Sequence, residues 1–247
     1  MLEIRQLSLC FPNGKRALTD LDLTVRAGEL VIVLGGNGSG KTTLLRCINR
    51  TLTPTAGEVW LNGLNITHLH GEGLRRARLE LAMISQHASL VGRRSALKNV
   101  ATGALGRHFN AWTAVGGLPA EELRLARGYL AQVGLSGLEQ QRAGTLSGGQ
   151  AQRVAVARAL AQKPKVLLAD EPVASLDPEA TSEIMRLLRH LATEEGHAVL
   201  CVLHQVELAY AYADRAIGIR DGRVAFDLAR ADMTKEAVNQ LYVSEAA

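Results

Sequence analysis

Alternating apolar and polar positions mark the first part of the chain and predict short β-strands. The alternation covers residues 2–9 and 17–25, which lie on either side of a turn at residues 12–15. We expect these two segments to pair as antiparallel strands of a small β region. Shorter strand patterns recur at residues 59–61 and 81–84.

Continuous apolar runs predict strands that are buried on both faces. They occupy residues 29–34, 166–169 and 198–203, and a helical stretch at 179–193 separates the last two. This alternation of buried strand and helix is typical of a parallel sheet. Residues 88–162 change to helical periodicity with glycine breaks, which predicts a helical insert. The expected fold class is therefore α/β, with a parallel-sheet core, an N-terminal antiparallel β subdomain and an inserted helical subdomain.

We expect a β-hairpin near the end of the chain, because two strand-like segments within residues 217–226 flank an Asp221-Gly222 turn. No internal repeat or low-complexity segment divides the chain, so we expect a single domain over residues 1–247. Its predicted parts are the core with its β subdomain at residues 1–87 and 163–227, the helical insert at 88–162 and a polar C-terminal tail at 228–247.

The composition excludes several classes of protein. Hydrophobic residues make up 47% of the chain, yet no apolar run approaches the roughly 18 to 20 residues that span a bilayer. The first residues lack a basic stretch followed by an apolar one, so we expect no secretory signal. The net charge of +4 is mild and aromatic residues are only 4%, so the stacking platforms of a nucleic-acid-binding protein are missing. We expect no nucleic-acid partner.

The cysteines indicate no disulfide framework. Cys10, Cys47 and Cys201 lie far apart on apolar stretches and form no C-x-x-C pair. An odd number of cysteines with this spacing argues against both disulfides and a cysteine zinc site. We therefore expect reduced thiols in the core.

A glycine-rich loop after the apolar run at residues 29–34 carries the first candidate chemistry. This loop matches the pattern G-x-x-x-x-G-K-[ST] and extends one residue beyond it. It consists of Gly35, Gly36, Asn37, Gly38, Ser39, Gly40, Lys41, Thr42 and Thr43. Between a strand and a helix, such a loop points its N–H groups and the positive helix end at nucleotide phosphates. Lys41 adds a charge, and Thr42 a hydroxyl for Mg²⁺. The alternative, a turn that only caps a helix, is disfavoured by the flanking strand and helix.

Two adjacent carboxylates, Asp170 and Glu171, end the apolar run at residues 166–169. At a strand end beside a phosphate loop, Asp170 can hold Mg²⁺ through water, and Glu171 can orient or deprotonate the attacking water. Alone, the pair would be better explained as acidic residues that favour the start of a helix. The phosphate loop upstream reverses that preference.

A second phosphate site is indicated where Ser147-Gly148-Gly149 opens a helix, since a helix start offers free N–H groups and a hydroxyl to an anion. One γ-phosphate does not need two such sites from one subunit. Residues 146–150, Leu-Ser-Gly-Gly-Gln, resemble the signature peptide of the ATP-binding cassette (ABC) superfamily.

The resemblance to the ABC superfamily extends over nearly the whole chain. Gln86 resembles the Q-loop glutamine, residues 175–177 resemble the D-loop and His204 resembles the switch histidine, all in family order. Phe11 stands where the family usually has an adenine-stacking tyrosine, so the ring is kept and the hydroxyl is lost. Taken singly, these would be ordinary core or surface residues, and their order beside the other motifs carries the resemblance.

This resemblance implies an ABC ATPase fold on a P-loop NTPase core that binds ATP and Mg²⁺. It also implies a head-to-tail dimer, in which the signature of one subunit closes over ATP on the phosphate loop of the other. The residues implied on the signature side are Ser147, Gly148, Gly149, Gln150 and Asp177. Metal contacts are implied for Thr42, Gln86 and Asp170, and catalytic roles for Glu171, His204 and Gln86.

A cassette without a membrane span acts through a partner, either a separate permease or a soluble machine on DNA or the ribosome. One cassette with a compact insert resembles a transporter subunit more than such a machine, and a P-loop kinase or GTPase would leave residues 146–150 unexplained. We expect the chain at the cytoplasmic face of the cell (inner) membrane, held by permease subunits that work with a solute-binding protein.

Within the family, the chain resembles the ATPases of phosphonate importers, a group that includes phosphite and hypophosphite relatives. Residues 169–178, 203–209 and 99–106, leading to Trp112, carry this resemblance. Glu207 departs from the aspartate usual in the group. The implied cargo is a phosphonate, phosphite or related reduced-phosphorus oxyanion, recognised by the partners and not by this chain. The alternatives are another small solute, such as a polar amino acid, and a non-transport ABC ATPase.

Overall fold

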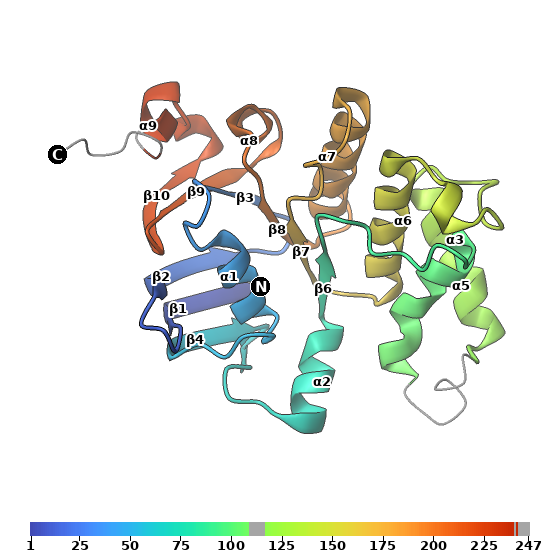
Figure 1. The fold of residues 1–247 in the computed structure, drawn as a ribbon, viewed down its shortest axis with the longest axis horizontal. Coiled ribbons are helices and arrows are strands. Elements are labelled where there is room, and N and C mark those ends of the chain that lie inside the picture. The colour runs from blue at the N-terminus through green and yellow to red at the C-terminus, as the bar shows by residue number, and fades with distance from the viewer. Residues whose placement is uncertain (109–116, 240, 242–247) are drawn as a thin grey trace.

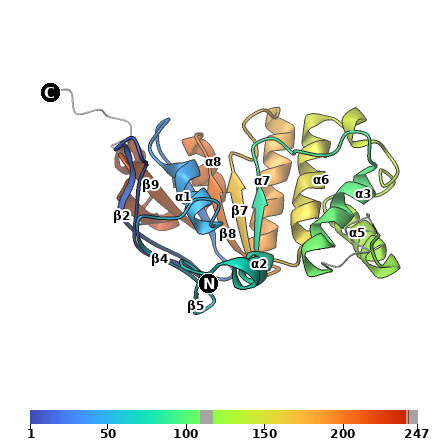
Figure 2. The same ribbon diagram turned by 60° about the horizontal axis from the view of Figure 1, so that its bottom comes forward.

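The computed structural model describes residues 1–108, 117–239 and 241, and arranges them as two sheets with helices (Figures 1 and 2). The strand order is β2-β1-β4-β5 in the smaller sheet and β10-β9-β3-β8-β7-β6 in the larger one. Trp112 and the last part of the predicted tail, from residue 242 onward, lie outside the described residues.

The smaller sheet is antiparallel and forms from the alternating segments. Its strands are β1 Leu2–Cys10, β2 Arg16–Val25, β4 Ala56–Leu61 and β5 Leu64–Asn65. The predicted antiparallel pairing of residues 2–9 with 17–25 is confirmed, and Leu2 lies opposite Val25. Side chains on one face of β1 and β2 are buried, because alternate residues of a strand point to the same side.

The larger sheet is the predicted parallel core. Its strands are β3 Leu30–Leu34, β6 Leu81–Ile84, β7 Val166–Asp170, β8 Ala198–Val202, β9 Arg215–Arg220 and β10 Arg223–Ala229. All pairings are parallel except that of β10 with β9, which form the predicted hairpin. Every residue of β3 and β8 is buried, as expected of strands covered on both faces.

Helices cover both faces of the larger sheet. The α-helices are α1 Lys41–Ile48, α2 Gly71–Leu79, α3 Ala96–Ala101, α5 Ala120–Gln132, α6 Gly148–Ala161, α7 Pro178–Thr193, α8 Val206–Tyr212 and α9 Lys235–Asn239. Short 3₁₀ helices are η1 Thr102–Arg107, η2 Ala143–Thr145 and η3 Arg230–Asp232. Val33 of β3 packs in one apolar cluster with Leu44 of α1, whereas Ile32 packs in another with Leu188 of α7. None of the described helices is both long enough and apolar enough to cross a bilayer.

Helices α3, α5 and α6 form a group on the side of the molecule away from the smaller sheet, at the right of Figure 1. They fall within the predicted insert at residues 88–162. Helix α6 also contacts the core: Gln152 Nε2 donates to the Ser85 carbonyl oxygen at 3.0 Å, and Gln162 Nε2 donates to that of Leu81 at 2.6 Å. The α/β fold class is confirmed, and the boundaries of the predicted parts stay predictions.

The expectation that all three cysteines lie in the core is wrong for one of them. Cys47 and Cys201 are buried free thiols, but Cys10 is exposed. Cys10 ends β1 and follows the buried Leu9, so the alternation of the strand turns its side chain outward.

Candidate functional site

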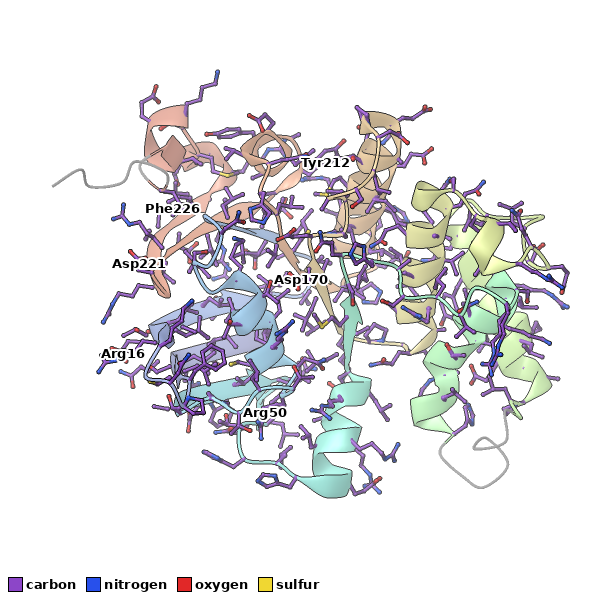
Figure 3. The ribbon with its side chains drawn as sticks, in the orientation of Figure 1. Arg16, Arg50, Asp170, Tyr212, Asp221 and Phe226 are labelled. Atoms are coloured by element: carbon purple, nitrogen blue, oxygen red, sulfur yellow. The ribbon has the colours of Figure 1, made fainter. Side chains whose placement is uncertain are left out.

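Neighbouring strands of the larger sheet, β3, β8, β7 and β6, present the candidate residues at one edge. The glycine-rich loop follows β3, His204 follows β8, Asp170 and Glu171 stand at the end of β7, and Gln86 follows β6. Because these strands are parallel, their carboxyl ends share one edge of the sheet. Figure 3 shows Asp170 in the middle of the molecule, beside the helix that follows the loop.

The glycine-rich loop is packed too closely for a side chain at two of its glycines. A Cβ atom on Gly40, whose φ is +109°, would lie 2.5 Å from the carbonyl oxygen of Ala17. A Cβ atom on Gly35 would collide with the carbonyl oxygen of Ile219 and lie 2.6 Å from Ser39 Oγ. That hydroxyl is buried and has no hydrogen-bond partner among the described residues. It fits a site that a polar ligand completes.

Lys41 begins helix α1 and lies under the loop. It is 5% exposed, and its Nζ donates to the carbonyl oxygens of Gly35 and Gly36, both at 2.8 Å. Burial lowers the pKa of Lys41, while the carboxylates of Glu171 and Asp170 act in the opposite direction. Among the residues that the structure describes, no side chain caps the start of α1, so the N–H groups there and this ammonium together suit a phosphate.

A cavity of about 280 Å³ opens at the loop. It is lined by Phe11, Lys15, Ala17, Asn37, Gly38, Ser39, Gly40, Lys41, Thr42, Thr43, Glu171 and His204. The structure thus gathers Phe11, residues 37–43, Glu171 and His204 around one space, whereas Gly35, Gly36 and Asp170 are not among the lining residues. Lys15 and Ala17 belong to no motif and were missed from the sequence. The turn at residues 12–15, closed by a 2.9 Å bond from Phe11 N–H to the Lys15 carbonyl oxygen, was the one signal that could have placed Lys15 beside Phe11.

Thr42 and Asp170 meet at the side of this cavity. Thr42 Oγ1 donates to Asp170 Oδ1 at 3.2 Å. Burial raises the pKa of Asp170, and the hydrogen bond from Thr42 partly offsets that effect. A hydroxyl and a carboxylate are oxygen donors of the kind that Mg²⁺ prefers.

Glu171 and His204 form a hydrogen-bonded pair at the cavity wall, with 2.5 Å between Glu171 Oε1 and His204 Nε2. The backbone of Glu171 has a φ of +49°, which costs a residue with a side chain about 1–2 kcal/mol. Its N–H donates to the carbonyl oxygen of Val202 at 3.1 Å, so the strand end holds it in place. A carboxylate fixed beside an imidazole in this way can accept a proton from water.

The predicted second phosphate site forms a separate cavity of about 330 Å³. Ser147, Gly148, Gly149 and Asp177 are among its lining residues, and none of its lining residues belongs to the first cavity. Ser147 Oγ accepts from Gln150 N–H at 3.2 Å, and Gln150 Oε1 accepts from Ser147 N–H at 3.0 Å, which fixes the start of α6. Strands β8, β7 and β6 lie between α1 and α6 in Figure 1.

Known proteins match this arrangement. The sequence profile of a family described as ABC transporter matches residues 18–174. The chain belongs to the ABC transporter family. As a member of that family, it is an ATP-binding protein and an ATPase.

Two curated members of the ABC family are similar over nearly the full length. The phosphonates import ATP-binding protein PhnC 3 of Halalkalibacterium halodurans is 43% identical over 243 residues, which cover 98% of this chain and 94% of the relative. The phosphonates import ATP-binding protein PhnC of Thiobacillus denitrificans is 45% identical over 244 residues, which cover 99% of this chain and 93% of the relative.

Solved ABC cassettes share the fold. A dimeric ATP-binding cassette in a post-hydrolysis state, bound to ADP and Pi, has a TM-score of 0.81 and 31% identity over 93% of this chain and 99% of the other. CbiO1 from Clostridium perfringens, part of the ABC transporter complex cbiONQ, has a TM-score of 0.84 and 30% identity over 97% of this chain and 92% of the other.

Gln86, which resembles the Q-loop glutamine of ABC ATPases, does not line the first cavity. It is exposed and comes just after Ile84, which pairs with Ala169 at the end of β7. It therefore lies at the same sheet edge as Asp170, two residues after the end of the neighbouring strand β6. Its contact with a metal stays a prediction.

Proposed function

We propose that this chain is the ATP-hydrolysing subunit of an ABC importer for phosphonate, phosphite or a related reduced-phosphorus oxyanion. The main support for ATP hydrolysis is that the glycine-rich loop and the hydrogen-bonded pair Glu171 and His204 line the same cavity. Support for the cargo comes from the full-length similarity to proteins named as phosphonates import ATP-binding proteins.

ATP fits the first cavity with its phosphates at the glycine-rich loop. Lys41 and the free N–H groups of α1 would balance the phosphate charge, and the Ser39 hydroxyl would gain the partner that it lacks. At the other end of the cavity, Phe11 offers a flat ring on which adenine can stack, and Lys15 offers a second positive charge.

The donor set at Thr42 and Asp170 fits Mg²⁺, because Thr42 offers a hydroxyl oxygen in the cavity lining and Asp170, hydrogen-bonded to it, offers carboxylate oxygens. A divalent cation there would favour the charged form of Asp170, whose pKa burial raises. When bound, Mg²⁺ would neutralise charge on the β- and γ-phosphates. We assign Gln86 as a further metal contact from the segment that follows the neighbouring strand β6.

Glu171 is assigned as the base for the attacking water. The water oxygen bonds to the γ-phosphorus, its proton passes to the Glu171 carboxylate, and the bond to the bridging oxygen breaks to release ADP and phosphate. His204 would hold Glu171 in orientation through the 2.5 Å contact and reach the γ-phosphate from the same wall.

A head-to-tail dimer is the assembly that uses both cavities. Within one chain, Ser147 and Asp177 line a cavity that shares no residue with the phosphate loop. In the proposed dimer, the start of α6, with Ser147, Gly148, Gly149 and Gln150, faces ATP held by the second copy, which gives the second phosphate site its ligand. A similar cassette is described as dimeric after hydrolysis, with ADP and Pi bound.

The permease and a solute-binding protein are the remaining proposed partners. In this proposal, the permease holds the chain at the cytoplasmic face of the cell (inner) membrane. We assign permease docking to the helical insert at residues 88–162, because the strands of both sheets are complete without it. Gln86 lies where the chain leaves β6 for this insert, which suits a hinge.

Hydrolysis that depends on cargo tests this function. The chain would be reconstituted in vesicles with its permease and solute-binding protein, and phosphate release measured with methylphosphonate, phosphite or a polar amino acid. We expect stimulation by the phosphorus compounds only. Stimulation by the amino acid alone would overturn the cargo and keep the ATPase. A hydrolysis rate that does not change with the permease but rises with DNA or ribosomes would indicate a soluble machine.

A further inference from the structure

The turn of the β9–β10 hairpin contacts two segments that line the nucleotide cavity, the phosphate loop and β2. Asp221 and Gly222 form this turn, and their φ angles of +51° and +74° are both positive. Gly222 is buried, although turn residues commonly lie at the surface. Figure 3 shows Asp221 at the end of the hairpin, next to the blue N-terminal region.

Gly222 is hydrogen-bonded on two sides. Its N–H donates to the carbonyl oxygen of Ser39 at 3.0 Å, and its own carbonyl oxygen accepts from Thr19 N–H at 2.9 Å. Ser39 belongs to the phosphate loop. Thr19 belongs to β2, and Ala17 near the start of that strand lines the cavity on the side of Phe11. One residue therefore bonds to both sides of the nucleotide cavity.

No side chain fits at Gly222 without moving the backbone. A Cβ atom there would lie 2.6 Å from the carbonyl oxygen of Ala17, 2.9 Å from its carbonyl carbon and 3.0 Å from Leu18 Cα. These are main-chain atoms, which cannot rotate away as the end of a flexible side chain can. All of these contacts are with β2 and none is with the phosphate loop. An added Cβ would therefore push β2 away from the hairpin.

The phosphate loop would stay with the hairpin during such a shift. Gly222 N–H bonds to Ser39, and Gly35 packs directly against the Ile219 carbonyl oxygen of β9. Gly40 of the loop also lies against Gly222, since a Cβ atom on Gly40 would lie 3.6 Å from Gly222 Cα. The hairpin and the loop are thus in contact at three places. We therefore expect the added Cβ to move β2 away from the loop. This movement would be along the direction in which a bound nucleotide extends.

We propose that Gly222 is a positioning residue that sets the distance between two halves of the nucleotide cavity. The phosphate half consists of residues 37–43, and the base half consists of Phe11, Lys15 and Ala17. ADP or ATP contacts both halves at once, so its affinity depends on their separation. Pyrophosphate contacts only the phosphate half, so its affinity does not.

The test compares the affinities of the full chain for ADP and for pyrophosphate by titration calorimetry. Gly222→Ala should weaken ADP binding on the order of tenfold and change pyrophosphate binding by less than about twofold. Gly222→Asn is the second variant, because asparagine tolerates a positive φ while its Cβ meets the same Ala17 atoms. Gly196→Ala is the matched control: the φ of Gly196 is also +74°, and no atom lies within 4 Å of its added Cβ.

The control should leave both affinities unchanged. Wild-type ADP affinity in a folded Gly222 variant would overturn the proposal. Equal losses for ADP and pyrophosphate would overturn it too, because they would show that the turn supports the loop alone. Failure of both Gly222 variants to fold, while Gly196→Ala folds, would assign the contact to stability and also count against a positioning role.

Discussion

Replacing Glu171 with glutamine separates proton transfer from nucleotide binding. Glutamine has the same shape, and its amide oxygen can keep a hydrogen bond to His204 Nε2, now 2.5 Å from the carboxylate. It cannot take up a proton at neutral pH. The carboxylate also lies near enough to Lys41 to influence the pKa of that lysine. Its removal therefore takes a negative charge away from the phosphate site.

The expected loss of hydrolysis follows from the role of a positioned base. Such a group contributes about 10²- to 10⁴-fold, which corresponds to about 3 to 5 kcal/mol of barrier. ATP affinity should stay the same or rise by roughly two- to threefold, because one repulsive charge is gone while Lys41, Thr42 and the loop are unchanged. The variant should thus bind ATP and stall.

Three measurements check this outcome on the purified Glu171→Gln chain and its permease complex. Single-turnover phosphate release gives the chemical step, and binding of a labelled ATP gives the affinity. Size-exclusion chromatography with ATP or ADP shows whether a stalled dimer accumulates, which we expect with ATP only. Glu171→Asp keeps the charge but withdraws it from the cavity, so its rate should fall between those of wild type and Glu171→Gln.

The general-base role would be refuted by turnover of Glu171→Gln within about fivefold of the wild-type rate. A monomeric elution profile with ATP, combined with brisk turnover, would refute it as well. A large and equal loss of ATP affinity and turnover would show that Glu171 serves binding and not chemistry.

Three further predictions follow from the contacts. Lys41→Ala should weaken ATP binding by roughly 10- to 100-fold, because a buried charged donor is lost; wild-type affinity in a titration would contradict the assignment. Gln86→Ala should reduce transport per ATP hydrolysed more than ATP affinity, and equal losses would exclude a hinge. Burial pushes the pKa of Glu122 up, but hydrogen bonds from His108 and Arg107 outweigh it and leave that pKa below 4.5. The resulting stability is present above about pH 4.5 and is lost as the pH falls through the lowered pKa. Glu122→Gln should therefore destabilise the fold at neutral pH by about 1–3 kcal/mol in denaturant unfolding and flatten this acid dependence; identical curves for both proteins would contradict it.

Local features of the candidate site could be predicted from the sequence. The phosphate loop depends on glycines and Lys41 at fixed spacing between a strand and a helix, and these are neighbours in the chain. The apolar runs predicted β3 and β8 because burial on both faces demands uninterrupted apolar residues. Parallel strands then bring Asp170 and the loop to one edge, whatever the details of packing.

Contacts between distant segments could not be predicted in this way. Lys15 and Ala17 line the cavity, and Gly222 bonds to Ser39, only because the hairpin and the smaller sheet pack against the loop. No periodicity or motif encodes that approach, since it depends on the sum of many side-chain contacts across both sheets. Cys10 shows the same limit on a smaller scale, because its exposure was decided by the side to which the end of β1 turns it.

The separation of the two candidate phosphate sites shows most clearly what each level decides. The residues at Lys41 and Ser147 each indicate an anion site locally, through a helix start that leaves N–H groups free. The distance between the sites is a property of the folded chain, because strands β8, β7 and β6 of the larger sheet lie between α1 and α6. The sequence by itself therefore determined which groups can bind phosphate, and the tertiary structure decided that one chain holds them in separate cavities.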